Sequence, residues 1–113
     1  MNDHPILESV EQLHLARLSE NTAADALATA RAQLERTKAI RLASAYQSGV
    51  IDGKNEQARK AQEAEILTAF EPVQKAEADL RLAESKHAAD RIDRQYREDR
   101  FNAFRALLNQ PRE

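Results

Sequence analysis

The sequence predicts an all-α fold: a long antiparallel helical hairpin of coiled-coil type that assembles into an oligomeric helical bundle. Of its 113 residues, 42% are hydrophobic and 32% are charged, a composition typical of amphipathic helices. Glycine, which breaks helices, occurs only at Gly49 and Gly53, close to the midpoint of the chain. Apolar residues recur at steps of three and four on both sides of this point, so we expect one long helix before it and one after it.

The first predicted helix covers about residues 5–47. Pro5 suits its first turn, because a backbone N–H would be unpaired there in any case. Apolar residues at steps of three and four are expected to form one stripe that faces inward. The stripe consists of Leu7, Val10, Leu13 or His14, Leu18, Ala23, Leu27, Ala30, Leu34 and Thr37. Cap-forming residues gather around Asn21, so the helix either bends there or continues, and continuity is favoured because no glycine or proline stops it.

The connector is predicted over residues 48–55, with Gly49 in the left-handed conformation that commonly follows the last turn of a helix. Either Asp52 or Asn55 is expected to cap the second helix, which covers about residues 56–109.

Pro72 lies inside this second helical pattern, where proline removes a hydrogen bond and clashes with the preceding turn. We therefore expect the second helix to kink or restart there. Beyond Pro72, two neighbouring apolar stripes follow steps of three and four residues. One stripe consists of Val73, Ala76, Leu80, Ala83 and His87. The other consists of Leu82, Ala89, Ile92, Tyr96, Ala103 and Leu107.

The hairpin also predicts a register between the helices. A turn centred near residue 51 brings position i opposite about position 102 minus i. Residues 1–25 carry five acids and one base, whereas residues 86–105 carry six bases and four acids, so the paired regions have opposite charge bias. The same register brings His14 close to His87.

The chain is predicted to form one domain, residues 1–113, with a thin core. About 26 apolar residues are larger than alanine, which is little for ordering a chain of this length. A lone two-helix hairpin would be marginally stable. We therefore expect a homo-oligomer or a protein partner.

Composition excludes several classes of function. The net charge of −2 argues against a general nucleic-acid coat, and the absence of cysteine excludes disulfides, thiolate catalysis and cysteine-bound zinc. No apolar run exceeds three residues, so no membrane span or signal peptide is predicted, and the cytoplasm is the expected location. No nucleophile lies beside a base, and we predict neither an enzyme nor a bound cofactor.

The connector is the first candidate site. Gly49-x-x-x-Gly53-Lys54 lacks the preceding strand, the spacing and the Ser or Thr of a phosphate loop. A hairpin loop whose glycines permit the turn is the favoured interpretation. Alternatively, the N-terminus of the second helix attracts an anion or partner through Lys54, Asn55 and Arg59.

The motif S-G-x-I-x-G-K-N-x-x-x-R-x-x-Q, from Ser48 to Gln62, follows Tyr46 and precedes a helix rich in alanine and glutamate. It resembles the connector of a group of small helical proteins encoded by bacteriophages and prophages, most of them without an assigned function. The similarity covers roughly residues 38–90. It implies a viral origin, a location in the host cytoplasm, and a non-enzymatic accessory role in defence inhibition, recombination or assembly, with specific contacts at the connector.

The second candidate is a basic face of the second helix, between Arg91 and Arg105. Arginine forks suit phosphates, and Tyr96 offers a stacking surface for a base. Acidic residues are interleaved, however, and an ion-paired face opposite the acidic first helix is the favoured interpretation. The candidate residues for partner or anion binding on this face are Arg91, Arg94, Tyr96 and Arg97.

His14 and His87 form the third candidate, because the predicted register places carboxylates beside them. Such a layer can hold a divalent metal ion. It lacks the close ligand spacing of established metal motifs, so we favour a polar layer that fixes the register and predict no metal.

These observations lead to two functional predictions. The first is a non-enzymatic phage-type accessory protein that acts by protein–protein interaction through a self-associating hairpin, with a host defence component as one conceivable target. The alternative is a helical protein that binds nucleotides or single-stranded nucleic acid through the Arg91–Arg105 face or the Lys54 connector.

Overall fold

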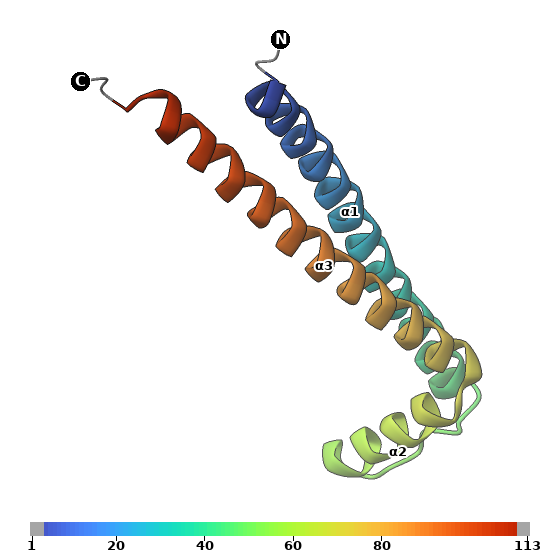
Figure 1. The fold of residues 1–113 in the computed structure, drawn as a ribbon. Coiled ribbons are helices and arrows are strands. Elements are labelled where there is room, and N and C mark those ends of the chain that lie inside the picture. The colour runs from blue at the N-terminus through green and yellow to red at the C-terminus, as the bar shows by residue number, and fades with distance from the viewer. Residues whose placement is uncertain (1–3, 111–113) are drawn as a thin grey trace. The chain divides into compact units, whose positions relative to one another are not determined.

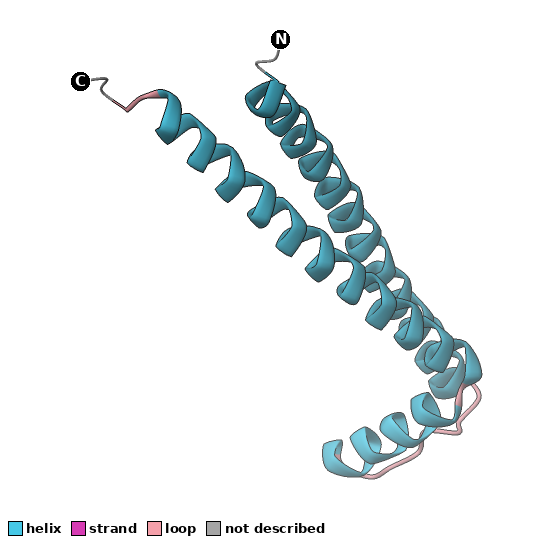
Figure 2. Cartoon of the chain, viewed as in Figure 1, coloured by secondary structure: helices cyan, strands magenta, loops and turns pink. Residues whose placement is uncertain are grey.

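Three α-helices account for the regular structure of residues 4–110, the part of the chain that the computed structural model describes (Figure 1). They are α1 (His4–Gln47), α2 (Glu56–Ala69) and α3 (Glu71–Leu108). No strand occurs among these residues, and loops are confined to the connector, the junction between α2 and α3, and the end of the described chain (Figure 2). The all-α class predicted from composition is confirmed.

The first helix is continuous and ends as its sequence predicts. α1 runs without interruption for 44 residues, so it does not break near Asn21. After its last turn, the Gly49 N–H donates to the Tyr46 carbonyl at 3.2 Å, and the Val50 N–H donates to the Ala45 carbonyl at 3.0 Å. Gly49 has a φ of 80°, the left-handed conformation that this pair of bonds requires.

Asn55, and not Asp52, caps α2. Its side-chain Oδ1 accepts a hydrogen bond from the Ala58 N–H at 2.8 Å, which satisfies one of the unpaired amides of the first turn. In the preceding connector, Ile51 is buried while Val50 is exposed. The connector is thus anchored by one apolar side chain and one cap.

Two of the helices have proline in their first turn. Pro5 and Pro72 are the second residues of α1 and α3, where a missing N–H costs no helical hydrogen bond. Before Pro72, Phe70 leaves helical geometry with φ −89° and ψ 112°. The Gln74 side chain then donates to the Thr68 carbonyl at 2.6 Å across the break. The predicted restart of the second helix is confirmed.

Packing divides the chain into two units. Unit 2 covers Leu27–Ala83, and unit 1 combines the residues up to Ala26 with those from Glu84 onward. Unit 2 holds an apolar core in which Val73 is 1% exposed. The buried members of this core are Leu34, Val73 and Ala76, and the half-buried residues against it are Leu67, Phe70 and Leu80.

Unit 1 pairs α1 and α3 in antiparallel orientation through a less apolar seam. α1 buries Leu13, Ala16 and Ala23 there, whereas no residue of α3 in this unit is fully buried. The predicted inward stripe of α1 is confirmed in part: Leu13 and Ala23 are buried, whereas the side chains of Leu7 and Leu18 are exposed. The buried residues recur with a heptad spacing, which places Leu7 and Leu18 on the opposite side of α1.

The predicted register is also wrong. Glu20 pairs with Arg94 and Gln12 pairs with Arg97, so the paired residue numbers add up to 114 and 109, not to about 102. The physical reason is α2. It is a separate helix with a break after it, so the segment between α1 and α3 contains more residues than a single turn near residue 51 would. The predicted meeting of an acidic and a basic region is confirmed by the Glu20–Arg94 pair.

Candidate interaction surfaces

The connector is held by the side-chain amide of Gln62. Its Oε1 accepts hydrogen bonds from the backbone N–H groups of Asp52 at 3.2 Å and Gly53 at 2.8 Å. Its Nε2 donates to the Asp52 carboxylate at 2.8 Å. One glutamine on α2 therefore fixes two consecutive residues of the connector, a role that sequence reasoning missed because the contact has no periodic signal.

Gly53 and Arg59 complete this clamp. A Cβ atom on Gly53 would lie 2.9 Å from the backbone of Ala58 and Arg59, closer than such atoms approach in proteins. The Arg59 guanidinium donates from Nη1 to the Gly53 carbonyl at 3.2 Å. Arg59, a candidate anion-binding residue, is thus engaged in part by the connector itself.

Tyr46 and Lys54 differ in how the fold uses them. The Tyr46 hydroxyl donates to the Glu63 carboxylate at 2.5 Å, and this hydrogen bond raises the pKa of Tyr46, with a further contribution from desolvation. Lys54 is exposed and forms no ion pair with a described residue. Among the candidate residues of the connector, Asn55 is used as a cap and Lys54 is left for other contacts.

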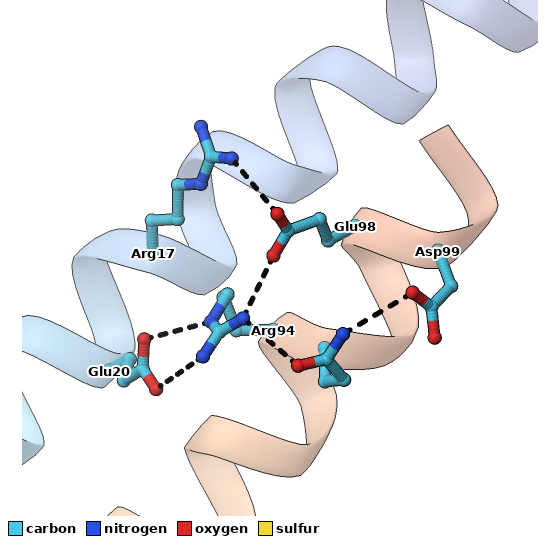
Figure 3. A network of polar contacts seen from close by, with 6 residues as sticks. Arg17, Glu20, Arg94, Glu98 and Asp99 are labelled. Atoms are coloured by element: carbon cyan, nitrogen blue, oxygen red, sulfur yellow. Dashed lines mark hydrogen bonds and ion pairs between the residues drawn. The ribbon is translucent and has the colours of Figure 1, made fainter. Parts of the chain in front are cut away.

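Arg94 is the centre of the polar seam in unit 1 (Figure 3). Its Nε and Nη2 donate to the two carboxylate oxygens of Glu20 at 3.0 and 3.3 Å, a bidentate pair, while its Nη1 donates to Glu98 at 2.8 Å. Glu98 in turn lies 3.9 Å from the guanidinium of Arg17. Only 22% of the Arg94 side chain and 18% of the Glu20 side chain are exposed.

This network shifts two pKa values in opposite directions. The hydrogen bond from Arg94 lowers the pKa of Glu20 from its ordinary value of 4.5; desolvation opposes the shift, and the charges of Arg94, His87 and Arg91 support it. The hydrogen bonds to Glu20 and Glu98 raise the pKa of Arg94. The charged forms of both partners are therefore favoured in the folded chain.

The basic face predicted on the second helix is divided by the fold. Arg97, like Arg94, turns towards α1 and donates to Gln12 at 2.8 Å, and it also pairs with Asp93 at 3.4 Å. Arg91 is exposed. The ring of Tyr96 is exposed as well, with the Arg97 guanidinium 5.5 Å from its centroid. Two of the four candidate side chains are therefore engaged within unit 1, and two are exposed.

The two histidines of the proposed layer occupy different environments. His14 is exposed on α1, whereas His87 is half-buried and close enough to Glu20 to affect its pKa. Within residues 4–110, no group of three or more histidine and carboxylate side chains has an arrangement that could hold a metal ion.

Unit 1 exposes many large apolar side chains. Ile92 and Tyr96 on α3 are 69% and 56% exposed. The exposed members on α1 are Leu7, Val10, Leu15 and Leu18, and those on α3 are Ile92, Tyr96, Leu107 and Leu108. A groove of about 380 Å³ runs beside them, lined by Leu15, Leu18, Ser19, Thr22, Ala23, Ala26, Lys86 and Asp90.

Unit 2 has a groove of about 370 Å³ near the connector. Arg41 stands in it with its guanidinium 5.0 Å from the centroid of the Phe70 ring, and its buried Nε has no hydrogen-bond partner. The groove is lined by Arg41, Val50, Gln62, Glu65, Ile66, Ala69 and Phe70.

Comparisons of the chain with protein-family models, with curated proteins and with solved structures give no match. The resemblance to phage-encoded proteins therefore stays a prediction. None of the helices within residues 4–110 is apolar over a long enough stretch to cross a membrane.

Proposed function

We propose that the chain is a non-enzymatic interaction protein that presents helical surfaces to other proteins and to copies of itself. The observation that supports this proposal is the distribution of polarity in unit 1. Large apolar side chains such as Ile92 and Leu18 are exposed, while the charged side chains of Arg94 and Glu20 are largely covered. Contiguous apolar surface on a folded chain commonly marks a protein interface.

The two sides of α1 lead to the same conclusion. One side buries Leu13 and Ala16 against α3, and the other exposes Leu7 and Leu18. A helix that is apolar on two sides is stabilised by covering both of them. The folded chain covers one, so we infer that a second contact covers the other.

Light scattering of the purified chain at increasing concentration tests self-association. We expect a defined oligomer at micromolar concentration with the far-ultraviolet circular dichroism of a helical protein. Capture of a partner from a bacterial host lysate, followed by reconstitution with that purified protein, tests the second part. A helical monomer at all concentrations that binds no reconstituted partner contradicts the proposal.

An accessory role in a bacteriophage, with a host defence component as partner, is the more specific form of this proposal. It rests on the resemblance of the connector motif. Lys54 is an exposed residue of that motif, and its side chain is available to a partner. We expect Lys54→Glu to weaken binding of such a partner at least tenfold, or about 1.4 kcal/mol, without lowering the helix content. An unchanged affinity would contradict a partner contact at Lys54 of the connector.

Binding of nucleotides or single-stranded nucleic acid is the alternative. It is favoured by the exposure of Arg91, Lys54 and the ring of Tyr96. It is weakened because Arg94 and Arg97 are engaged within unit 1. Titration with labelled oligonucleotides at low salt tests it, since binding to phosphates is strongest there. The absence of binding at low salt rejects this alternative.

A further inference from the structure

We propose that the groove of unit 2 binds the C-terminal carboxylate of another protein chain whose last residue is apolar. Arg41 holds the carboxylate, and the apolar walls of the groove cover the last side chain. This inference rests on the protein interaction proposed above and adds a site and the chemistry of the partner.

The groove lies within one packing unit, and three segments build it. Arg41 comes from α1, Val50 from the connector and Phe70 from the junction between α2 and α3. One side of α2, which includes Glu65 and Ile66, forms the remaining wall. Ligand sites in proteins typically have volumes of roughly 300–1,000 Å³. The volume of this groove, about 370 Å³, therefore suits the end of a chain and not a long peptide.

Arg41 is held in place while its hydrogen-bond donors remain unused. Its guanidinium lies 5.0 Å from the centroid of the Phe70 ring. Such a contact engages the face of the guanidinium, whereas its N–H groups lie in the plane. The buried Nε has no hydrogen-bond partner, and Arg41 forms no ion pair with a described residue. The groove therefore contains an oriented cation that lacks an acceptor.

The charges of the groove favour a carboxylate as that acceptor. The fork of a guanidinium matches the paired oxygens of both carboxylates and phosphates. Glu65, which is exposed, adds a negative charge to the lining. Because like charges repel, a group with a single negative charge is accommodated better than a phosphate with two or more. We therefore assign a carboxylate to Arg41.

The apolar walls and Glu65 point to a chain terminus. Ile66 and Phe70 are half-buried, and Val50 is 54% exposed, so an apolar side chain next to the carboxylate would cover them. The last residues of a protein chain also carry backbone N–H donors. The carboxylate of Glu65 accepts hydrogen bonds and suits these donors, which a free aliphatic acid lacks.

Labelled peptides provide the first test on the wild-type chain. The probes are four peptides in which Gly-Ser-Ala precedes a last residue of Val, Leu, Ile or Phe, and fluorescence anisotropy measures their binding. We expect at least one to bind saturably, and its C-terminal amide to bind at least tenfold more weakly, because the amide carries no charge for Arg41. Equal binding of the two forms, or no binding of any peptide up to about 1 mM, overturns the proposal.

Substitution of Arg41 tests the assigned cation. Arg41→Met keeps an apolar stem beside Phe70 and removes the fork, so it should weaken peptide binding at least tenfold. Arg36→Met is the matched control, since Arg36 is an exposed arginine of the same helix outside the groove, and it should leave the affinity unchanged. Wild-type affinity in an Arg41→Met chain that keeps its helix content overturns the assignment. If this variant does not fold, the comparison of carboxylate and amide on the wild-type chain decides.

Competition with ATP and hexanoate separates a chain terminus from other anions. Both should displace the labelled peptide less well than the same peptide without its label. Glu65→Gln is expected to strengthen the competition by ATP, because a repelling charge is removed. Tighter binding of ATP overturns the proposal in favour of the nucleotide alternative. Tighter binding of hexanoate overturns the chain terminus and assigns the groove to a free acid.

Nuclear magnetic resonance locates the bound peptide. We expect the amide signals of Val50, Ile66 and Phe70 to shift during the titration, since these residues line the groove. Shifts confined to unit 1 overturn the site.

The outcomes separate this inference from the proposed function. The peptides are tested on the purified chain without a partner protein. A chain that oligomerises or binds a reconstituted partner, but binds none of the peptides, overturns the groove and leaves the proposed function standing. A monomer that binds neither the peptides nor a reconstituted partner contradicts both.

Discussion

Gly53 lies where the fold leaves no room for a side chain, because a Cβ there would lie 2.9 Å from the backbone of Ala58 and Arg59. The contact involves backbone atoms of the first turn of α2, which cannot move without disturbing the cap. We expect Gly53→Ala to lower the free energy of unfolding by about 1–3 kcal/mol in urea titrations. Lys54→Ala, next to it and exposed, should change it by less than about 0.5 kcal/mol. Equal effects of the two would mean that the connector does not approach α2 this closely.

Glu20 provides a pH-dependent contribution to stability. Its pKa in the folded chain lies below the ordinary value of 4.5, chiefly because Arg94 donates hydrogen bonds to it. The stabilisation is present above about pH 4.5 and is lost as the pH falls through the lower folded pKa. We expect Glu20→Gln to be less stable than wild type at pH 7, with the difference shrinking as the pH falls below 4.5 and through the lower folded pKa of Glu20.

Urea titrations across this pH range measure the effect. Glu11→Gln is the matched control, since Glu11 is an exposed carboxylate of the same helix. Its stability at pH 7 should lie closer to that of wild type than the stability of Glu20→Gln does. A difference for Glu20→Gln that is constant from pH 7 to pH 3 would contradict the role of the charged pair.

At the scale of the elements, α2 depends on its cap more than the long helices do on theirs. It has only 14 residues and buries none of them fully, and short helices are marginal without tertiary or capping contacts. We expect Asn55→Ala to cost about 1 kcal/mol and to speed hydrogen exchange at the Ala58 amide. Asn55→Asp keeps an oxygen acceptor and should preserve both. Unchanged exchange in Asn55→Ala would show that Gln62 alone holds the start of α2.

The ends of these elements could be predicted because local chemistry sets them. Gly49, Asn55 and Pro72 each act within one helical turn, through a left-handed backbone, a cap oxygen and a missing N–H. The clamp of Gln62 on the connector could not be predicted, since it joins residues about ten positions apart without any periodic pattern. A viral origin, inferred from the connector motif, stays a prediction. The glycines, asparagine, arginine and glutamine of the motif all have a role in folding the connector.

The register and the choice of seam lie beyond local chemistry. Both stripes of α3 have helical spacing, and nothing in a stripe tells which one contacts α1. The side of α3 that carries Arg94 contacts α1, where Arg94 pairs with Glu20. The more apolar stripe, which contains Ile92, is left exposed. Composition indicated a thin core correctly, because the buried residues of α1 in unit 1 include Ala16 and Ala23.

At the scale of the whole molecule, the two units are stabilised by different forces. Unit 2 buries Leu34 and Val73 in an apolar core, and removing such side chains costs free energy at any ionic strength. Unit 1 combines small buried residues with the charged pair of Arg94 and Glu20. Attraction between partly exposed charges is screened by salt. The units should therefore respond differently to ionic strength.

Hydrogen exchange resolved by peptide tests this difference. We expect amides of residues 4–26 and 84–108 to exchange faster than those around Leu34 and Val73. Raising the salt from about 0.05 M to 0.5 M shortens the screening length to a few ångströms and should accelerate exchange in unit 1 only. Arg94→Ala should reproduce this acceleration at low salt and remove its salt dependence. Uniform protection in both units, unaffected by salt, would mean that the polar seam of unit 1 is held by packing and not by its charges.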